Sequence, residues 1–361
     1  MRQSVFRKVL RHKLGLIGFI IIAFFSVIAF FGYLITPDQT PDANDIQLPL
    51  AGEKPGAEIK FIRIYDGTEI KSSFLKTMLS GKQDNFKAIP VKGNPVSING
   101  DSLKIQLYTG SEDTTHLYGV FYTGATPKEK PQFETRKYYL GADAPFGRDV
   151  LSRLMIGSRI SLAVGLVAVV ISLLIGTVLG LFAGYYRGWA DRIIMWLINV
   201  IWSLPTFLLV VAISFALGKG FWQIFVAVGL SSWVEVARMV RGQVFSVREK
   251  EYIQAARVLG FSNMRIMFRH ILPNIKGPLI VVATANFGSA ILLEAGLSFL
   301  GLGVEPPAPS WGMMIKEYFG FIVLDSAYLA IIPGIAIMVL VMAFNFLGIA
   351  LRDALDVNIS E

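Results

Sequence analysis

Residues 160–186 read ISLAVGLVAVVISLLIGTVLGLFAGYY and contain no charged side chain. A helix needs about 20 apolar residues to cross a bilayer, so this stretch by itself predicts a membrane-spanning helix. Three further uncharged runs are long enough to do the same, at residues 14–35, 193–218 and 326–351. Pro205 and Pro333 lie inside two of these runs and predict kinks there.

Two more runs are apolar but carry charges. Residues 277–303 are interrupted once, by Glu294. Residues 221–240 carry Glu235 and Arg238 near their end, which we place at the membrane surface. Counting both runs, we expect an all-α membrane protein with six transmembrane helices.

The composition agrees with a membrane protein. Of 361 residues, 53% are hydrophobic and 17% are charged, whereas soluble domains carry about 25% charged residues. The chain has no cysteine, which excludes disulfides, thiolate metal sites and cysteine nucleophiles. The P-loop pattern Gly-x-x-x-x-Gly-Lys-Ser/Thr and the common hydrolase patterns are absent. We therefore expect no catalytic residue, no metal site, no cofactor on this chain and no enzymatic activity.

Residues 36–140 differ from the rest of the chain. They hold 13 Lys/Arg and 13 Asp/Glu and no run long enough to span a membrane. Short apolar stretches within them end at Asp66-Gly67 and Asn99-Gly100. Asp-Gly and Asn-Gly supply the positive φ angles of tight hairpins. We expect a small β-rich, water-soluble insert between the first two transmembrane helices.

Basic residues are distributed unevenly along the chain. Six spans place 16 of the 21 Lys/Arg outside the insert on the side of the N-terminal tail. The positive-inside rule puts that side, with both termini, in the cytoplasm and puts the insert outside. The net charge of +8 then reflects membrane orientation, not nucleic-acid binding. Arg148, Arg153 and Arg159 run against this trend on the outer side, where we expect Asp143 and Asp149 to offset part of their charge.

A cytoplasmic segment carries the most specific pattern in the chain. Residues 251–260 read EYIQAARVLG, in which apolar and small side chains recur with the spacing of one helix face. The residues on that face are Tyr252, Ala255, Ala256 and Leu259. Two alanines on a helix face allow a partner to approach closely. A basic helix that lies on anionic lipid is the alternative interpretation.

The same segment predicts a sharp elbow. Gly260 stands where a helix ends in the left-handed conformation. Ser262 is suited to cap a second helix that starts at the next residue. Pro273 then ends that helix or begins the next span.

This elbow resembles the coupling loop of ABC-importer permeases. The likeness rests on Gln254-Ala255-Ala256, Gly260 and Leu272-Pro273. In that family the elbow inserts into a groove of a cytoplasmic ATPase subunit. The resemblance therefore implies a coupling role for Glu251, Tyr252, Gln254, Ala255, Ala256, Gly260, Leu272 and Pro273. Gln254 replaces a common glutamate of the pattern, and His270 replaces a common isoleucine.

Three other segments are similar to the C-type permease of dipeptide and oligopeptide importers. They are RHKLGLIG at residues 11–18, GRDVLSR at residues 147–153 and EAGLSFLGLG at residues 294–303. The resemblance implies the type I ABC-importer permease fold.

The chain then has three parts. Residues 1–35 form a basic tail and the first helix, and residues 36–140 form the insert. Residues 141–357 form a permease core with five helices, and its coupling loop covers about residues 246–273.

The resemblance also implies partners and a location. The partners are a second permease subunit in a heterodimer, two cytoplasmic ATPase subunits that hold ATP and Mg²⁺, and an extracytoplasmic substrate-binding protein. The location is the bacterial cytoplasmic (inner) membrane. Peptides are the expected substrate, with nickel or another small solute open within the family. A self-sufficient secondary transporter and a membrane-anchored receptor built on the insert are the competing classes.

Several residues inside the spans stand out. Small residues recur every fourth position in one span and predict a close packing seam with another helix: Ser172, Gly176, Gly180 and Gly184. Glu294 is an acid inside a span, which points either to a pathway or gate or to a structural pairing with an arginine such as Arg159. Asn286 and Asn345 are further pathway or gate candidates.

Overall fold

The structure of the protein is a computed structural model that divides the chain into two compact units. The helical unit comprises Met1–Phe25, Ser161–Glu305 and Ile335–Glu361. The sheet unit comprises Ser26–Ile160 and Pro306–Gly334. The residues that the structure describes are 5–65, 73–83, 85–98, 102–110, 117–122, 132–218, 220–324 and 326–355.

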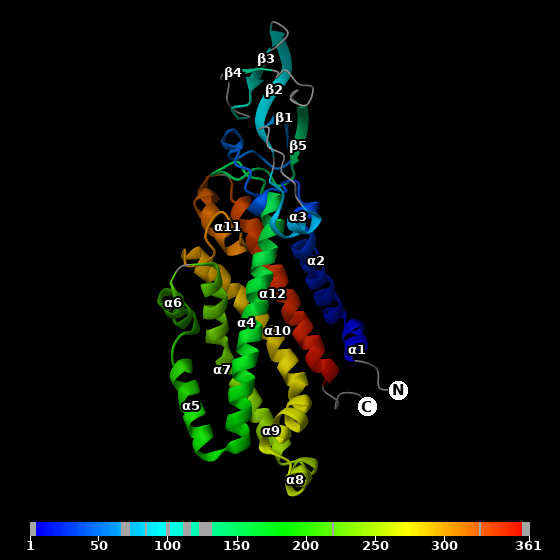
Figure 1. Cartoon of the computed structure of the whole chain (residues 1–361), viewed down its shortest axis with the longest axis vertical. Helices are drawn as coiled ribbons and strands as arrows, with labels where there is room; N and C mark the ends of the chain where they lie inside the picture. Colours follow the sequence, from blue (N-terminus) through cyan, green and yellow to red (C-terminus); the bar gives the residue numbers. More distant parts are fainter. Residues whose placement is uncertain are drawn as a thin grey trace. The chain divides into compact units, whose positions relative to one another are not determined.

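A five-stranded antiparallel sheet forms among the described residues of the sheet unit (Figure 1). Its spatial order is β4-β3-β2-β1-β5. The strands are β1 (Ala57–Tyr65), β2 (Phe86–Ile98), β3 (Ser102–Leu107), β4 (Tyr118–Tyr122) and β5 (Gln132–Tyr138). The helix α3 (Phe74–Ser80) and the 3-10 turns η1 (Pro41–Ala43) and η2 (Leu48–Leu50) accompany it. A small sheet is therefore present, as expected, and the turn signals Asp66-Gly67 and Asn99-Gly100 lie outside the described residues.

The inner strand β1, which pairs with β2 and β5, has apolar side chains on both faces. Side chains alternate between the faces of a strand, so Phe61 and its neighbour Ile62 point in opposite directions. Both are fully buried. Phe61 packs in a cluster with Leu50 and Tyr138, and Ile62 packs with Val91. Hydrophobic contacts on two faces hold the sheet together.

The other elements among the described residues are helices (Figure 1). The long ones are α2 (Lys13–Ile35), α4 (Val150–Tyr186), α5 (Gly188–Trp202), α6 (Thr206–Leu217), α7 (Phe221–Arg248), α10 (Leu272–Phe299) and α12 (Tyr328–Leu355). The short ones are α1 (Val5–Arg11), α8 (Glu251–Val258), α9 (Asn263–Arg265), the π-helical turn η4 (Ile266–Ile271), α11 (Trp311–Tyr318) and the 3-10 turn η5 (Phe319–Val323). Among the described residues, five helices are long and apolar enough to cross a membrane, and up to six crossings result if α5 and α6 count as one.

The run predicted as one span at residues 193–218 is two helices. α5 and α6 meet at 94° across a short break that ends at Pro205. Proline lacks the N–H that would continue the helix, and its ring clashes with the preceding turn. The kink predicted at Pro205 is thus a full bend. By contrast, α12 contains Pro333 and remains one helix on both sides of it.

The fourth predicted span is longer than expected. α7 continues to Arg248 and does not end near residue 240. Glu235 therefore lies at the middle of this helix and not near its end, whereas its expected place at the membrane surface stays a prediction. In the sequence alone, a charge inside an apolar run looks like the end of the run. Hydropathy does not show whether the charged side chain faces a cavity within the protein.

Candidate functional site

The predicted elbow consists of α8 and α9 and the turn between them. Gly260 has φ of +75°, in the left-handed region. Its N–H donates to Arg257 O at 3.0 Å, and the Phe261 N–H donates to Ala256 O at 3.1 Å. This pair of bonds is the Schellman motif, which satisfies the last carbonyls of a helix. The Ser262 hydroxyl then accepts from the Arg265 N–H at 3.4 Å and caps α9.

The residues of α8 divide between a buried and an exposed face. Ile253 and Ala256 are buried against their own chain. Ala256 is therefore not exposed, contrary to the face predicted from spacing. The exposed apolar side chains of α8 and its C-cap are Tyr252, Ala255, Val258 and Leu259. Val258 is 88% exposed, and Leu259 is 72% exposed.

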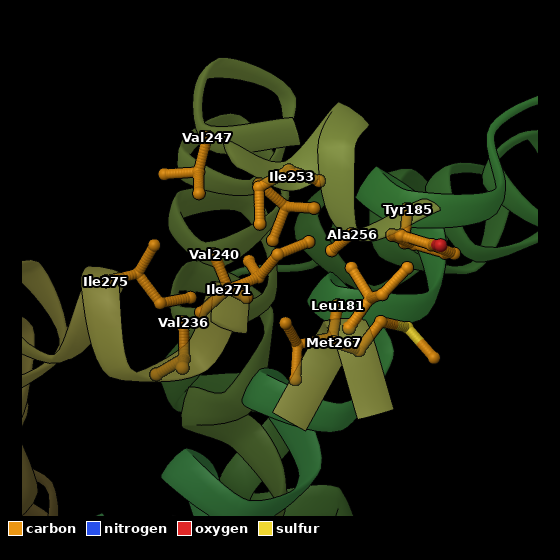
Figure 2. Close-up of a cluster of buried hydrophobic side chains, with 12 residues drawn as sticks. Leu181, Tyr185, Val236, Val240, Val247, Ile253, Ala256, Met267, Ile271 and Ile275 are labelled. Carbon is orange, nitrogen blue, oxygen red and sulfur yellow. The ribbon is translucent and has the colours of Figure 1, made fainter. Parts of the chain in front are cut away.

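A hydrophobic cluster lies beneath the elbow (Figure 2). Ile253 and Ala256 meet side chains from α4, α7, η4 and α10 there. Figure 2 shows the cluster around Val240, Ile271 and Leu181. The other labelled members are Tyr185, Val236, Val247, Met267 and Ile275. The elbow is therefore anchored to three long helices through buried apolar contacts.

Polar contacts add to this anchor. The Tyr185 hydroxyl donates to Asn263 Oδ1 at 2.8 Å. The guanidinium groups of Arg248 and Arg257 lie 5.7 and 5.5 Å from the centre of the Tyr185 ring. These cations stack on an aromatic face and hold the end of α4 against the elbow.

The remaining coupling-loop candidates lie around the elbow. Glu251 and Gln254 are exposed on α8, and Gln254 Nε2 donates to Glu249 O at 3.2 Å. Leu272 packs against the cluster beneath the elbow, and Pro273 stands in the first turn of α10. Partial desolvation raises the pKa of the Tyr252 hydroxyl above its usual value.

The small residues of α4 face α7 of the same chain. Ser172 is fully buried, and its hydroxyl donates to Val169 O within α4. The three glycines lie so close to α7 that an added Cβ would overlap valine side chains. The distances from such a Cβ to the valine Cβ are 2.5 Å for Gly176 and Val236, 2.7 Å for Gly180 and Val240, and 2.7 Å for Gly184 and Val244.

The pathway candidates lie in three separate places. Asn286 lines a cavity of about 430 Å³ between α5, α6, α7 and α10, and Glu235 lines the same cavity. Glu294 is fully buried elsewhere in α10, where its Oε1 accepts from the Ser298 hydroxyl at 2.7 Å. Asn345 is exposed on α12, with its Nδ2 donating to Val341 O.

The pairing of Glu294 with Arg159 stays a prediction, and the Arg159 guanidinium stacks over the Tyr33 ring at 4.9 Å. Glu235 was missed as a site residue because its charge was interpreted as the end of a span. Among the described residues, no group of three or more His, Asp or Glu is arranged to hold a metal ion.

Two family comparisons cover most of the chain. Residues 176–361 match the family of binding-protein-dependent transport system inner membrane components. Residues 1–50 match the N-terminal transmembrane domain of oligopeptide transport permease C. Both matches confirm the resemblance found in the sequence.

Individual relatives agree. A glutathione transport system permease protein, GsiD, of Pectobacterium atrosepticum is 45% identical over 219 residues, covering 61% of this chain and 72% of the relative. A dipeptide transport system permease protein, DppC, of Alkalihalophilus pseudofirmus is 42% identical over 235 residues, covering 65% of this chain and 77% of the relative. Among solved structures, the inward-facing MetNI methionine ABC transporter aligns with a TM-score of 0.47 at 23% identity, over 56% of this chain and 96% of that one.

Proposed function

Since the chain belongs to the family of binding-protein-dependent transport system inner membrane components, we propose that it forms half of the translocation path of an ATP-driven importer for di- and oligopeptides. The chain is a membrane-spanning permease subunit with the mostly helical type I ABC-importer fold. The peptide substrate is inferred from two relatives whose names specify glutathione and dipeptide transport.

The rest of the importer comes from other chains. A second permease subunit completes the path, two cytoplasmic ATPase subunits bind ATP and Mg²⁺, and a substrate-binding protein delivers peptide from outside. The family's description names binding-protein dependence, which supports this assembly. The chain itself lacks a P-loop, so ATP hydrolysis falls to its partners. The positive-inside rule, applied to the basic residues, places both termini in the cytoplasm and residues 36–140 outside.

One observation carries the coupling part of the proposal. α8 presents four exposed apolar or small side chains while its opposite face is buried in the cluster beneath the elbow. An exposed apolar surface on a rigidly anchored helix is typical of a protein contact. We assign this surface to the groove of an ATPase subunit. ATP-driven movement of that groove would then reach α4, α7 and α10 through the cluster.

A pull-down tests the assembly. The tagged chain is extracted gently from its native membrane, and every co-purifying chain is identified. The expected result is a second permease and one or two P-loop ATPases. Recovery of the chain alone, still transporting after reconstitution, would instead favour a secondary transporter.

A variant tests the contact surface. Val258→Asp places a charge at the most exposed apolar position of α8 and is expected to remove the ATPases from the pull-down. Trp189→Asp is the control, because Trp189 is a similarly exposed apolar residue, 73% exposed, that lies on α5 and not on α8. Equal ATPase recovery by both variants would contradict docking through α8.

A further inference from the structure

The cavity of about 430 Å³ lies at the bend between α5 and α6 and against the middle of α7 and α10. Its volume is within the range of small-molecule sites, about 300–1,000 Å³. Glu235 is at the midpoint of α7, and Asn286 is at the midpoint of α10. Both helices are long and apolar enough to cross a membrane.

Glu235 brings a negative charge to this cavity. The ion pairs among the described residues do not include it. Arg238, one turn further along α7, makes no ion pair with it, and the Arg238 guanidinium lies 3.5 Å from the centre of the Trp202 ring. A carboxylate at the middle of a span is costly unless it faces protein charge, water or a ligand. The cavity therefore favours a ligand that carries a cation.

Asn286 brings a hydrogen-bond donor that no described residue uses. Its side chain is 3% exposed, and its Nδ2 is buried without a partner. Buried donors in native proteins are almost always paired, so one that lines a cavity points to an acceptor on a ligand. Ser231 and Ser232 also line the cavity, and their hydroxyls both donate to Val228 O. These hydroxyls can therefore only accept hydrogen bonds from a ligand.

We propose that this cavity receives the amino-terminal end of the peptide during transport. The Glu235 carboxylate accepts hydrogen bonds from the α-ammonium group, and Asn286 Nδ2 donates to a backbone carbonyl oxygen. Apolar walls that include Trp202, Phe207 and Leu292 accommodate side chains of different size. The site thus recognises the peptide backbone and not one particular sequence. This inference rests on the proposed function as a peptide permease.

The absence of cysteine from the chain provides a clean test. Ser289 lines the cavity and is exposed, so Ser289→Cys places one thiol there. Asn274→Cys is the matched control, because Asn274 is exposed on the same helix outside the cavity lining. The complex, purified with its co-purifying subunits, is treated with a small methanethiosulfonate reagent. The probes are tri-alanine and N-acetyl-tri-alanine, which lacks the ammonium charge.

The expected result is slower labelling of Cys at position 289 by tri-alanine but not by the acetylated peptide. Adding Glu235→Gln or Asn286→Leu should weaken protection by about tenfold or more, as expected for losing a hydrogen bond to a charged or buried group. Labelling at position 274 should not respond to either peptide. Equal protection by both peptides, or full protection in the Glu235→Gln background, would overturn the assignment.

Uptake separates failure of this inference from failure of the proposed function. Reconstituted complex with its binding protein is assayed for ATP-dependent import of tri-alanine. Import by wild type together with unaltered import by Glu235→Gln would refute the cavity assignment alone. No import or ATPase stimulation by any of several peptides would instead refute the peptide permease, whatever the cavity binds.

Discussion

The Tyr185 hydroxyl donates a hydrogen bond of 2.8 Å to the side-chain oxygen of Asn263. This bond joins the last turn of α4 to the first residue of α9. The Tyr185 ring is 4% exposed and belongs to the cluster beneath the elbow. A displacement of the elbow therefore reaches a long membrane helix through one buried side chain, without a flexible loop between them.

Tyr185→Phe tests this link. The variant keeps the ring and removes one hydrogen bond, at an expected cost of about 1 kcal/mol. Amides of residues 261–266 should then exchange hydrogen faster by about fivefold in the assembled complex. Tyr186→Phe is the control, because Tyr186 is a partly exposed neighbour. Equal exchange in both variants would show that the bond does not restrain the elbow.

Gly260→Ala tests the elbow's backbone. No atom lies within 4 Å of the position of an added Cβ, so the variant acts through the positive φ alone. The left-handed conformation costs a non-glycine residue about 1–2 kcal/mol. We expect reduced peptide uptake at an unchanged amount of protein in the membrane. Gly242→Ala is the control, because a Cβ added there also has no atom within 4 Å and Gly242 has no positive φ. This control should transport normally. Full uptake by the Gly260 variant would show that the elbow does not need a left-handed glycine.

The elbow and the bend show what the sequence reveals and what it hides. Gly260 and Ser262 act within a few residues of their own position, so their roles were readable from local spacing. Which face of α8 is buried depends on α4, α7 and α10, and spacing alone assigned Ala256 to the wrong side. Glu235 was misplaced for a similar reason. Its environment is built by Asn286 and the α5–α6 bend, which no window along the chain contains.

Asp149 predicts a pH dependence of stability. Burial raises its pKa to about 6, helped by the charge of Asp38 and opposed by hydrogen bonds from Ser152. Because the folded pKa is above the unfolded value of 3.8, the folded state binds the proton more tightly. The free energy of unfolding should therefore fall as pH rises from about 4 to about 6, by up to about 3 kcal/mol.

Asp149→Asn tests this effect. Asparagine keeps an oxygen that accepts from the Ser152 N–H, a bond of 2.8 Å, but does not titrate. In this variant, the unfolding temperature of the purified chain should depend less on pH between pH 4 and 8. It should also be higher than that of the wild type at pH 7. Glu58→Gln is the control, because the hydrogen bond from Lys137 lowers the pKa of Glu58 and gives the opposite sign. A wild-type chain more stable at pH 7 than at pH 5 would contradict the role of Asp149.

Two of the three arginines that we expected on the outer side, Arg148 and Arg153, have acidic partners. Arg148 Nε donates to Asp143 Oδ2 at 2.6 Å, as expected. Asp149 was expected to offset these charges too, but it is held by Ser152 instead. The second partner is Glu317, whose Oε2 lies 2.8 Å from Arg148 Nη2 and 3.3 Å from Arg153 Nη2. Glu317 is distant along the chain, so sequence proximity pointed to the wrong acid.

Glu317→Gln should strongly destabilise the sheet unit, to which these residues belong. Arg148 is 2% exposed and Arg153 is fully buried. The variant therefore removes a negative charge that both buried cations share. Removing one partner of a buried pair costs about 3–5 kcal/mol. Glu305→Gln, at an exposed position, should have little effect on thermal unfolding.

A double variant separates charge pairing from other effects. Adding Arg148→Met to Glu317→Gln removes one of the two unpaired cations. It should restore part of the lost stability, since the effects of directly contacting groups are not additive. Strictly additive losses in this double variant would show that Glu317 stabilises the fold by some means other than its charge on Arg148.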